Sequence, residues 1–172
     1  MYAVVHKGHL IVSLLEIRSE LMTPENQSHG ATEIKVLLVD DDIAALEELQ
    51  EIVELEGWKA KTATTVDEAL ATLVDDPEIG VVVSDYHFAQ PDGEGANGMQ
   101  FVSRAQARFA HRDISYIILS GDPGALRSSI QVGASKFLSK PLLVDDFIHA
   151  IKTAKANDGD ENAGKNQRLI AI

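Results

Sequence analysis

From Ile34 onward, short apolar runs alternate with longer stretches in which apolar residues recur at helical spacing. Apolar or β-branched runs of about four to eight residues are typical of buried strands, and recurrence every three to four residues is typical of amphipathic helices. Each strand-like run is followed by an amphipathic stretch, so the pattern predicts five strands alternating with five helices. The runs that predict strands are, in chain order, IKVLLV, WKAKTA, IGVVVS, ISYIILS and SKFLS.

Residues typical of helix ends mark several of the predicted boundaries. Thr65 and Glu68 form the capping-box pattern that opens a helix. Asp122 and Pro123 have the residue types of an N-cap and a first helical position, so they predict a helix that begins at Pro123. Gly133 follows the last apolar position of that helix and predicts its C-terminal end.

The alternation of strands and helices predicts the fold class. Right-handed crossovers between parallel strands place helices on both faces of a sheet when the winding direction changes. We therefore expect an α/β, doubly wound, flavodoxin-like fold with a five-stranded parallel sheet in the order 2-1-3-4-5. Such sheets bind ligands beyond the carboxyl ends of the strands, where the strand order reverses, which here is between the first and third strands.

The pattern divides the chain into a folded domain over 34–155, an N-terminal extension over 1–33 and a polar tail over 156–172. The extension has two interpretations, a coiled-coil-like helix or a hairpin around Lys7 and Gly8, and two heptads are too few to predict a dimer. The apolar residues with coiled-coil-like spacing are Leu10, Leu14, Ile17 and Leu21.

Met22 begins a polar stretch that leads into the first predicted strand. We hypothesise that native translation starts at this methionine. A peptide map that recovers residues before Met22 from untagged native protein would refute the hypothesis.

Net charge and composition exclude several function classes. The formal charge is −12, whereas phosphate backbones attract clustered Lys and Arg, so we expect no nucleic-acid partner. The chain has no cysteine and therefore neither a disulfide framework nor a Cys-type zinc site. No apolar run reaches the roughly 18–20 residues of a membrane helix, and we expect a cytoplasmic monomer or weak homodimer with no membrane partner.

Carboxylates follow two of the predicted strands. Asp40 and Asp41 come directly after the first strand, and Asp85 ends the third. Because these strand ends meet at one edge, we expect the three carboxylates to converge on one crevice. Two ionised carboxylates about 4 Å apart repel by about 4 kcal/mol at an effective dielectric near 20, so the crevice needs a cation. Oxygen ligands without His or Cys favour Mg²⁺.

A simpler interpretation of the first acidic cluster is that Asp40–Asp42 stabilise the N-terminus of the following helix. It accounts for Asp42 but not for Asp85, which precedes a loop.

A hydroxyl and an ammonium group follow the last two strands. Ser120 ends the fourth predicted strand, and Lys140 follows the fifth. Alone, the serine is typical of a strand-end cap and the lysine of a solvated surface charge. Together with a metal around the Asp85 carboxylate, they form a site suited to a phosphoryl group, with Asp85 as the nucleophile.

These motifs together resemble the receiver domain of bacterial two-component response regulators over residues 34–155. The matching stretches are VDDD, VVVSDY, ILSGD and GASKFLSKP. The resemblance implies that Asp85 accepts a phosphoryl group from a phosphohistidine of a sensor histidine kinase or phosphotransfer protein. It also implies a single-domain signalling protein rather than an enzyme, with only self-catalysed phosphotransfer and dephosphorylation.

The resemblance further implies a Mg²⁺ ligand set. Asp41 and Asp85 would bind the ion directly, Asp40 largely through water, and His87 through its backbone carbonyl. The segment YHFAQPDGEGANG after Asp85 is several residues longer than the usual connection in the family. This departure leaves the His87 assignment and the lifetime of the phosphate open.

By the same resemblance, Ser120 and Lys140 would hold phosphoryl oxygens, and the Lys140–Pro141 bond would be cis. Phe137 matches the switch aromatic of the family, and ordinary core packing is the alternative. The fourth helix, fifth strand and fifth helix would bind a downstream protein.

Two other functions remain as alternatives. One is a receiver-like domain that no longer accepts a phosphoryl group and serves as a binding module. A looser resemblance is to haloacid-dehalogenase-type phosphatases, which would use Asp40 as nucleophile and Asp42 as its partner but would leave Asp85 without a role.

Overall fold

The computed structural model describes residues 4–5, 34–87 and 98–156. The strands are β1 (Val4–Val5), β2 (Lys35–Val39), β3 (Lys59–Ala63), β4 (Val81–Asp85), β5 (Ser115–Ser120), β6 (Lys136–Ser139) and β7 (Leu142–Leu143). The helices are α2 (Ile43–Leu55), α3 (Val66–Asp75), α4 (Gly98–Arg108), α5 (Ala125–Val132) and α6 (Val144–Ala156).

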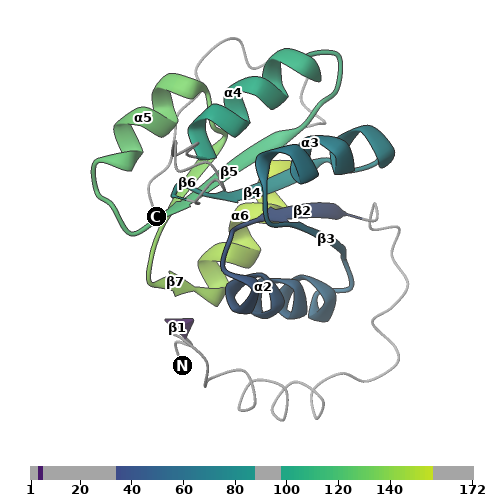
Figure 1. Cartoon of the computed structure of the whole chain (residues 1–172). Coiled ribbons are helices and arrows are strands. Elements are labelled where there is room, and N and C mark those ends of the chain that lie inside the picture. The colour runs from purple at the N-terminus through teal and green to yellow at the C-terminus, as the bar shows by residue number, and fades with distance from the viewer. Residues whose placement is uncertain (1–3, 6–33, 88–97, 157–172) are drawn as a thin grey trace.

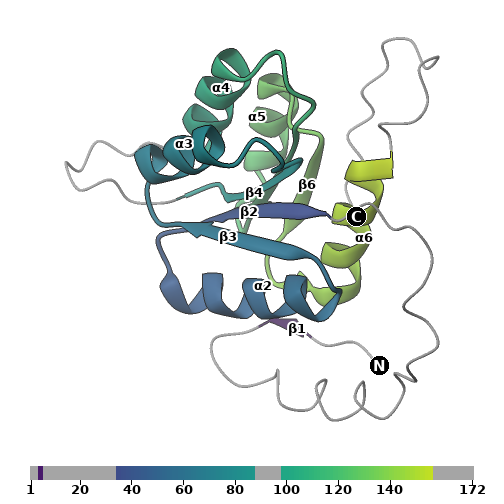
Figure 2. The same cartoon turned by 90° about the vertical axis from the view of Figure 1, so that its right-hand side faces the viewer.

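Five of the strands form one parallel sheet in the order β3-β2-β4-β5-β6. This is the predicted order 2-1-3-4-5, and the prediction of a doubly wound α/β fold is confirmed. Helices α3, α4 and α5 cover one face of the sheet, and α2 and α6 cover the other (Figures 1 and 2). The sequence alternates strand and helix, and the crossovers carry the helices to both faces.

Two hydrophobic cores lie on opposite faces of the sheet because successive strand side chains point in opposite directions. Leu37 and Val39 of β2 pack in the core beneath α3, α4 and α5. Val36 and Leu38 of the same strand pack in the core beneath α2 and α6. All four are buried, and this burial on both faces explains why the strand is a continuous apolar run.

Local capping decides where α3 begins. The Thr65 side chain accepts a hydrogen bond from the Glu68 backbone N–H at 3.2 Å, as the capping box predicts. The Glu68 carboxylate accepts from the backbone N–H of Thr64 at 2.7 Å, one residue before the predicted partner. The helix start is therefore confirmed, with the reciprocal bond displaced by one residue.

The predicted start of α5 at Pro123 is wrong, because the helix begins at Ala125. The Asp122 carboxylate accepts from the backbone N–H of Gly124 at 2.8 Å, and the Asp122 carbonyl accepts from Ala125 N–H at 3.0 Å. These bonds form a turn that contains Pro123 and Gly124 before the helix starts. The predicted C-terminal end is confirmed, since Gly133 adopts the left-handed conformation with φ of 76°.

The short strand β1 pairs with β7 in an antiparallel two-stranded sheet, a contact that the sequence did not indicate. The pairing joins Val4 to Leu143 and Val5 to Leu142. The predicted hairpin turn, the coiled-coil-like stretch and Met22 lie outside the described residues, as does the tail after residue 156.

Arg112 links two segments that lie beside each other only in the folded chain. Its guanidinium donates hydrogen bonds to the backbone carbonyls of Leu73, Asp76, Pro77 and Ile79. These carbonyls belong to the end of α3 and the turn before β4, whereas Arg112 follows α4. One cation therefore satisfies helix-end carbonyls that have no partner within the helix.

We expect Arg112→Ala to lower the free energy of unfolding by about 2–3 kcal/mol, because hydrogen bonds to a charged group contribute about 1.5–3 kcal/mol. Arg108→Ala is the matched control, since both guanidinium groups lie over the Phe109 ring, at 5.3 Å for Arg112 and 5.6 Å for Arg108. An exposed cation–π contact contributes about 0.5–1 kcal/mol, so this control should lose no more than that. Urea unfolding followed by Trp58 fluorescence measures both, and equal losses would contradict the role of the carbonyl bonds.

Candidate functional site

Four polar side chains lie at the carboxyl ends of four neighbouring strands. Asp40 follows β2, Asp85 ends β4, Ser120 ends β5 and Lys140 follows β6. The parallel register aligns these ends, because β2 lies beside β4, β4 beside β5 and β5 beside β6. The fold thus brings residues a hundred positions apart in sequence to one edge of the sheet.

The Lys140 ammonium group contacts both carboxylates. Its Nζ lies 2.6 Å from Asp85 Oδ1 and 3.3 Å from Asp40 Oδ2. The two aspartates are buried, with exposed fractions of 7% and 4% respectively. The backbone N–H of Lys140 donates to the Ser120 carbonyl at 2.8 Å, and the Lys140–Pro141 bond is cis.

Burial and charge change the pKa values of this group. Burial raises the pKa of Asp40, and the Asp85 charge adds to the rise, while the Asp42 N–H and the Lys140 ammonium oppose it. Burial would lower the pKa of Lys140, but its bond to Asp85 and the charges of both aspartates raise that pKa above 10.5. Lys140 is therefore protonated at neutral pH and neutralises part of the negative charge.

Local backbone turns orient three of the four side chains. Asp40, Asp85 and Ser120 each accept a hydrogen bond from the backbone N–H two residues later, at 3.0, 2.9 and 3.0 Å. Such turns are typical of Asp and Ser, whose short side chains reach the backbone nearby. These local bonds act together with the Lys140 contacts to orient the two aspartates.

The structure brings together two of the three predicted carboxylates. Asp40 and Asp85 share one ammonium group, whereas Asp41 is exposed. Within the described residues, no three Asp, Glu or His side chains lie where they could hold a metal ion together. The predicted convergence of three carboxylates is therefore met by Asp40 and Asp85 alone.

Comparison with known proteins identifies the family. A family model described as the response regulator receiver domain matches residues 36–152, well over half of the chain. The chain belongs to this family. The receiver domain thus accounts for the five-stranded sheet, and membership supports a phospho-accepting signalling role in two-component systems.

Individual relatives agree with this assignment. The two-component response regulator PprB of Pseudomonas aeruginosa is 29% identical over 120 residues, which cover 68% of this chain and 42% of the relative. A probable chemotaxis protein CheY of Rhizobium etli is 27% identical over 124 residues, covering 71% of this chain and 92% of the relative. The crystal structure of a response regulator receiver domain protein from Clostridium thermocellum has a TM-score of 0.64 and 26% identity, covering 73% of this chain and 96% of that one.

The chain spans about two fifths of the length of PprB, which is therefore much longer than the receiver domain itself.

None of the helices in the described part of this chain is long and apolar enough to cross a bilayer.

Two further residues of the receiver domain were expected to act at this site. The His87 side chain is exposed, and its Nε2 lies 4.0 Å from Asp122 Oδ2. The Phe137 ring is buried, with 6% exposed, in the core beneath α3, α4 and α5. Phe137 of β6 pairs with Ile118 of β5, and Ser139 pairs with Ser120. Phe137 therefore lies in the strand next to Ser120, two residues before the position that pairs with it.

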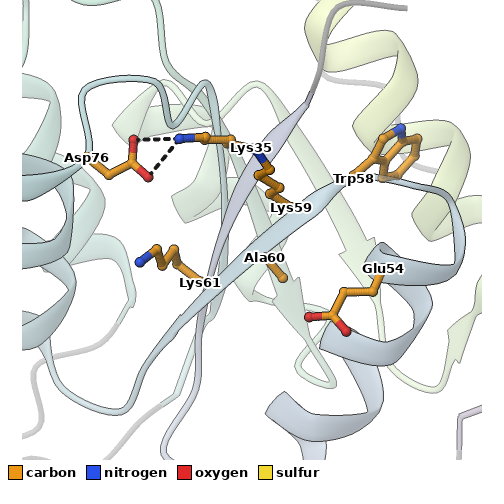
Figure 3. Close-up of a pocket in the computed structure, with 7 residues that line it drawn as sticks. All are labelled: Lys35, Glu54, Trp58, Lys59, Ala60, Lys61 and Asp76. Atoms are coloured by element: carbon orange, nitrogen blue, oxygen red, sulfur yellow. Dashed lines mark hydrogen bonds and ion pairs between the residues drawn. The ribbon is translucent and has the colours of Figure 1, made fainter.

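A second polar hollow lies at the opposite, amino ends of β2 and β3 (Figure 3). There the Lys35 ammonium binds the Asp76 carboxylate at 3.2 and 3.3 Å, and the Trp58 ring lies at the far side of the hollow. Lys35 also pairs with Glu78. Its charge is thus neutralised by neighbouring acids, and this hollow is separate from the carboxyl-end site.

We expect Lys140 and Asp40 to be energetically coupled by about 1 kcal/mol in a double-mutant cycle of Lys140→Ala and Asp40→Asn. Because the pKa of Lys140 is raised, its contribution is complete below its unfolded value of 10.5 and is lost only as pH rises through the higher folded value. The coupling should therefore be the same at about pH 7 and about pH 9.

The measurement is chemical denaturation of the four proteins at each pH. The control cycle uses Arg104 and Asp67, an exposed ion pair with an N–O distance of 3.6 Å, whose coupling should stay below about 0.5 kcal/mol. Equal coupling in both cycles would show that burial adds nothing to the Lys140 contact.

Proposed function

We propose that Asp85 accepts a phosphoryl group from the phosphohistidine of a sensor histidine kinase or phosphotransfer protein. The observation that carries the proposal is the contact of 2.6 Å between the Lys140 ammonium and the Asp85 carboxylate at the end of the central strand. In the transfer, a carboxylate oxygen of Asp85 forms the bond to phosphorus while the P–N bond breaks. The electron pair of that bond leaves with the imidazole, which is then protonated.

Lys140 and Ser120 supply what a transferred phosphoryl group requires. Phosphoryl transfer depends mainly on positioning and on neutralisation of the charge on the phosphoryl oxygens. The Lys140 ammonium already contacts the acceptor. The Ser120 oxygen accepts a hydrogen bond from Asp122 N–H, which leaves the hydroxyl proton to be donated to a phosphoryl oxygen.

The charge balance of the site fits Mg²⁺. Two buried carboxylates face one ammonium group, so the site keeps a net negative charge and offers only oxygen ligands. The ion would be held by the buried Asp40 and Asp85 together with the backbone carbonyl of His87, and the exposed Asp41 would have to turn towards them to join it. When bound, it supplies the additional positive charge that stabilises the transferred phosphoryl group.

Phosphorylation would change the surface that binds a downstream protein. The acyl phosphate carries about two negative charges where the Asp85 carboxylate carried one, and it lies at the same edge as Ser120, whose strand leads through a short loop into α5. The aromatic ring of Phe137 lies in the adjacent strand and serves as the switch residue. The surface that binds the downstream protein is formed by α5, β6 and α6. The protein works in the cytoplasm as a monomer or weak homodimer.

Labelling with a small phosphodonor tests the proposal. The protein is incubated with Mg²⁺ and acetyl phosphate, and the modified residue is located by mass spectrometry. We expect one phosphoryl group on Asp85, none on Asp85→Asn, and unchanged labelling of Asp75→Asn, an exposed aspartate at the end of α3.

Other labelling results would support other functions. A transient label on Asp40 with turnover of an added phosphoester would indicate a phosphatase. A folded protein that takes no label from acetyl phosphate or phosphoramidate would indicate a binding module that acts without phosphorylation.

Mg²⁺ at about 100 times its Kd should stabilise the protein by about 2.7 kcal/mol, because it binds only the folded state. Asp40→Asn should gain less than this. Without metal, the variant should be the more stable protein at neutral pH, because burial raises the pKa of Asp40 and its ionisation opposes folding.

The sign of this effect gives a pH test of the metal-free protein. As pH falls through the raised folded pKa of Asp40 towards its ordinary value of 3.8, the wild type should approach the stability of Asp40→Asn. Asp42→Asn is the matched control, since Asn keeps the N-cap of α2 and the residue is exposed.

In the Mg²⁺ experiment, equal stabilisation of wild type and Asp40→Asn by the ion would contradict the assignment of Asp40 as a ligand.

A further inference from the structure

Gly98, the first residue of α4, lies against the backbone of Asp85. A Cβ atom at this position would lie 2.0 Å from the Asp85 carbonyl oxygen and 2.8 Å from the Ser84 hydroxyl oxygen. Real Cβ atoms essentially never approach within 3.0 Å, and the closest atom here is backbone that cannot rotate away. Gly98 does not have a positive φ, unlike Gly57 and Gly133, so space rather than conformation requires the glycine.

A pair of hydrogen bonds connects Gly98 to the carboxylate of Asp85 through one peptide group. The Gly98 N–H donates to the Tyr86 carbonyl at 2.8 Å. That carbonyl belongs to the same peptide group as the His87 N–H, which donates to Asp85 Oδ2 at 2.9 Å. The orientation of this peptide therefore determines where one carboxylate oxygen lies.

The opposite side of the same backbone is held by β5. The Tyr86 N–H donates to the Leu119 carbonyl at 2.8 Å. The peptide groups on both sides of Tyr86 are thus fixed, one by the neighbouring strand and one by the start of α4. With Oδ2 bound to the His87 amide and Oδ1 to the Lys140 ammonium, both oxygens of Asp85 have a defined place.

We propose that Gly98 is a positioning residue for the phosphoryl acceptor. Its missing side chain permits α4 to approach Asp85, and its amide holds the Tyr86–His87 peptide that orients Oδ2. This inference rests on the proposed function, because it assigns Gly98 a part in the reaction of Asp85. The hydrogen bond from Gly98 to Tyr86 also joins α4 directly to the residues that follow β4.

The test compares Gly98→Ala with wild type in labelling by acetyl phosphate over a range of donor concentrations. Displacement of a reacting group by about 1 Å can cost about a hundredfold in rate, so we expect the maximal labelling rate to fall by about 10- to 100-fold. The donor concentration for half-maximal rate should change far less, because Gly98 does not contact the donor. Rates are expressed per folded molecule, with the folded fraction measured by denaturation.

Gly124→Ala is the matched control. The nearest atoms to its added Cβ belong to the exposed carboxylate of Asp122, at 3.2 Å, which is the end of a side chain and not backbone. Its labelling rate should remain within about twofold of wild type, since the change creates no backbone contact near the acceptor. An unchanged maximal rate in Gly98→Ala would overturn the inference.

A measurement on the unaltered protein decides the matter if Gly98→Ala fails to fold. The amide hydrogen of Gly98 should exchange at least about 100-fold more slowly than in an unfolded chain, because it is buried and bonded to Tyr86. Exchange at the unfolded rate, followed by NMR, would overturn the inference. If wild type takes no label on Asp85, the proposed function fails, while the exchange result still tests the Gly98 contact independently.

Discussion

One ammonium group, shared between two buried carboxylates, makes the carboxyl edge of this sheet compatible with folding. Lys140 follows the edge strand β6, and its side chain extends past β5 to reach Asp85 and Asp40 on the two central strands. Without it, two neighbouring ionised carboxylates would repel each other by several kcal/mol, at about 4 kcal/mol for a separation near 4 Å. A single positive charge does not balance both aspartates. The edge is therefore stable enough to form and still negative enough to attract a further cation.

The same contacts define how a phosphoryl group on Asp85 would act on the rest of the domain. Each polar group at the edge already has a partner, so a phosphoryl group that carries about two negative charges, in place of the single charge of the carboxylate, must redistribute those partners. Ser120 connects the edge to a surface helix, because its oxygen binds the Asp122 amide in the turn before α5. A movement of Ser120 towards the phosphate would therefore be felt first at the start of that helix.

Sequence reasoning predicted the sheet order and the meeting of Asp40, Asp85 and Lys140 at one edge, because the signals were local or repeated. The apolar runs and the Thr65 cap each depend on a few neighbouring residues. The start of α5 failed because Asp122 has the same preference for a turn as for an N-cap, and its carboxylate binds Gly124 N–H instead. Asp41 is exposed beside the buried Asp40, because both follow the end of β2 and the alternation of strand side chains no longer predicts which of them is buried. The closeness of Gly98 to Asp85 was invisible, since contact between them depends on how α4 lies on the sheet.

The order in which the site residues occur along the chain has a consequence for synthesis on the ribosome. Asp40 and Asp85 emerge long before Lys140, which follows the last strand of the sheet. A nascent chain that stops short of this lysine carries the acceptor but lacks the counter-charge that holds it beside Asp40. Only translation through Lys140 supplies the cation that neutralises part of the charge on both carboxylates.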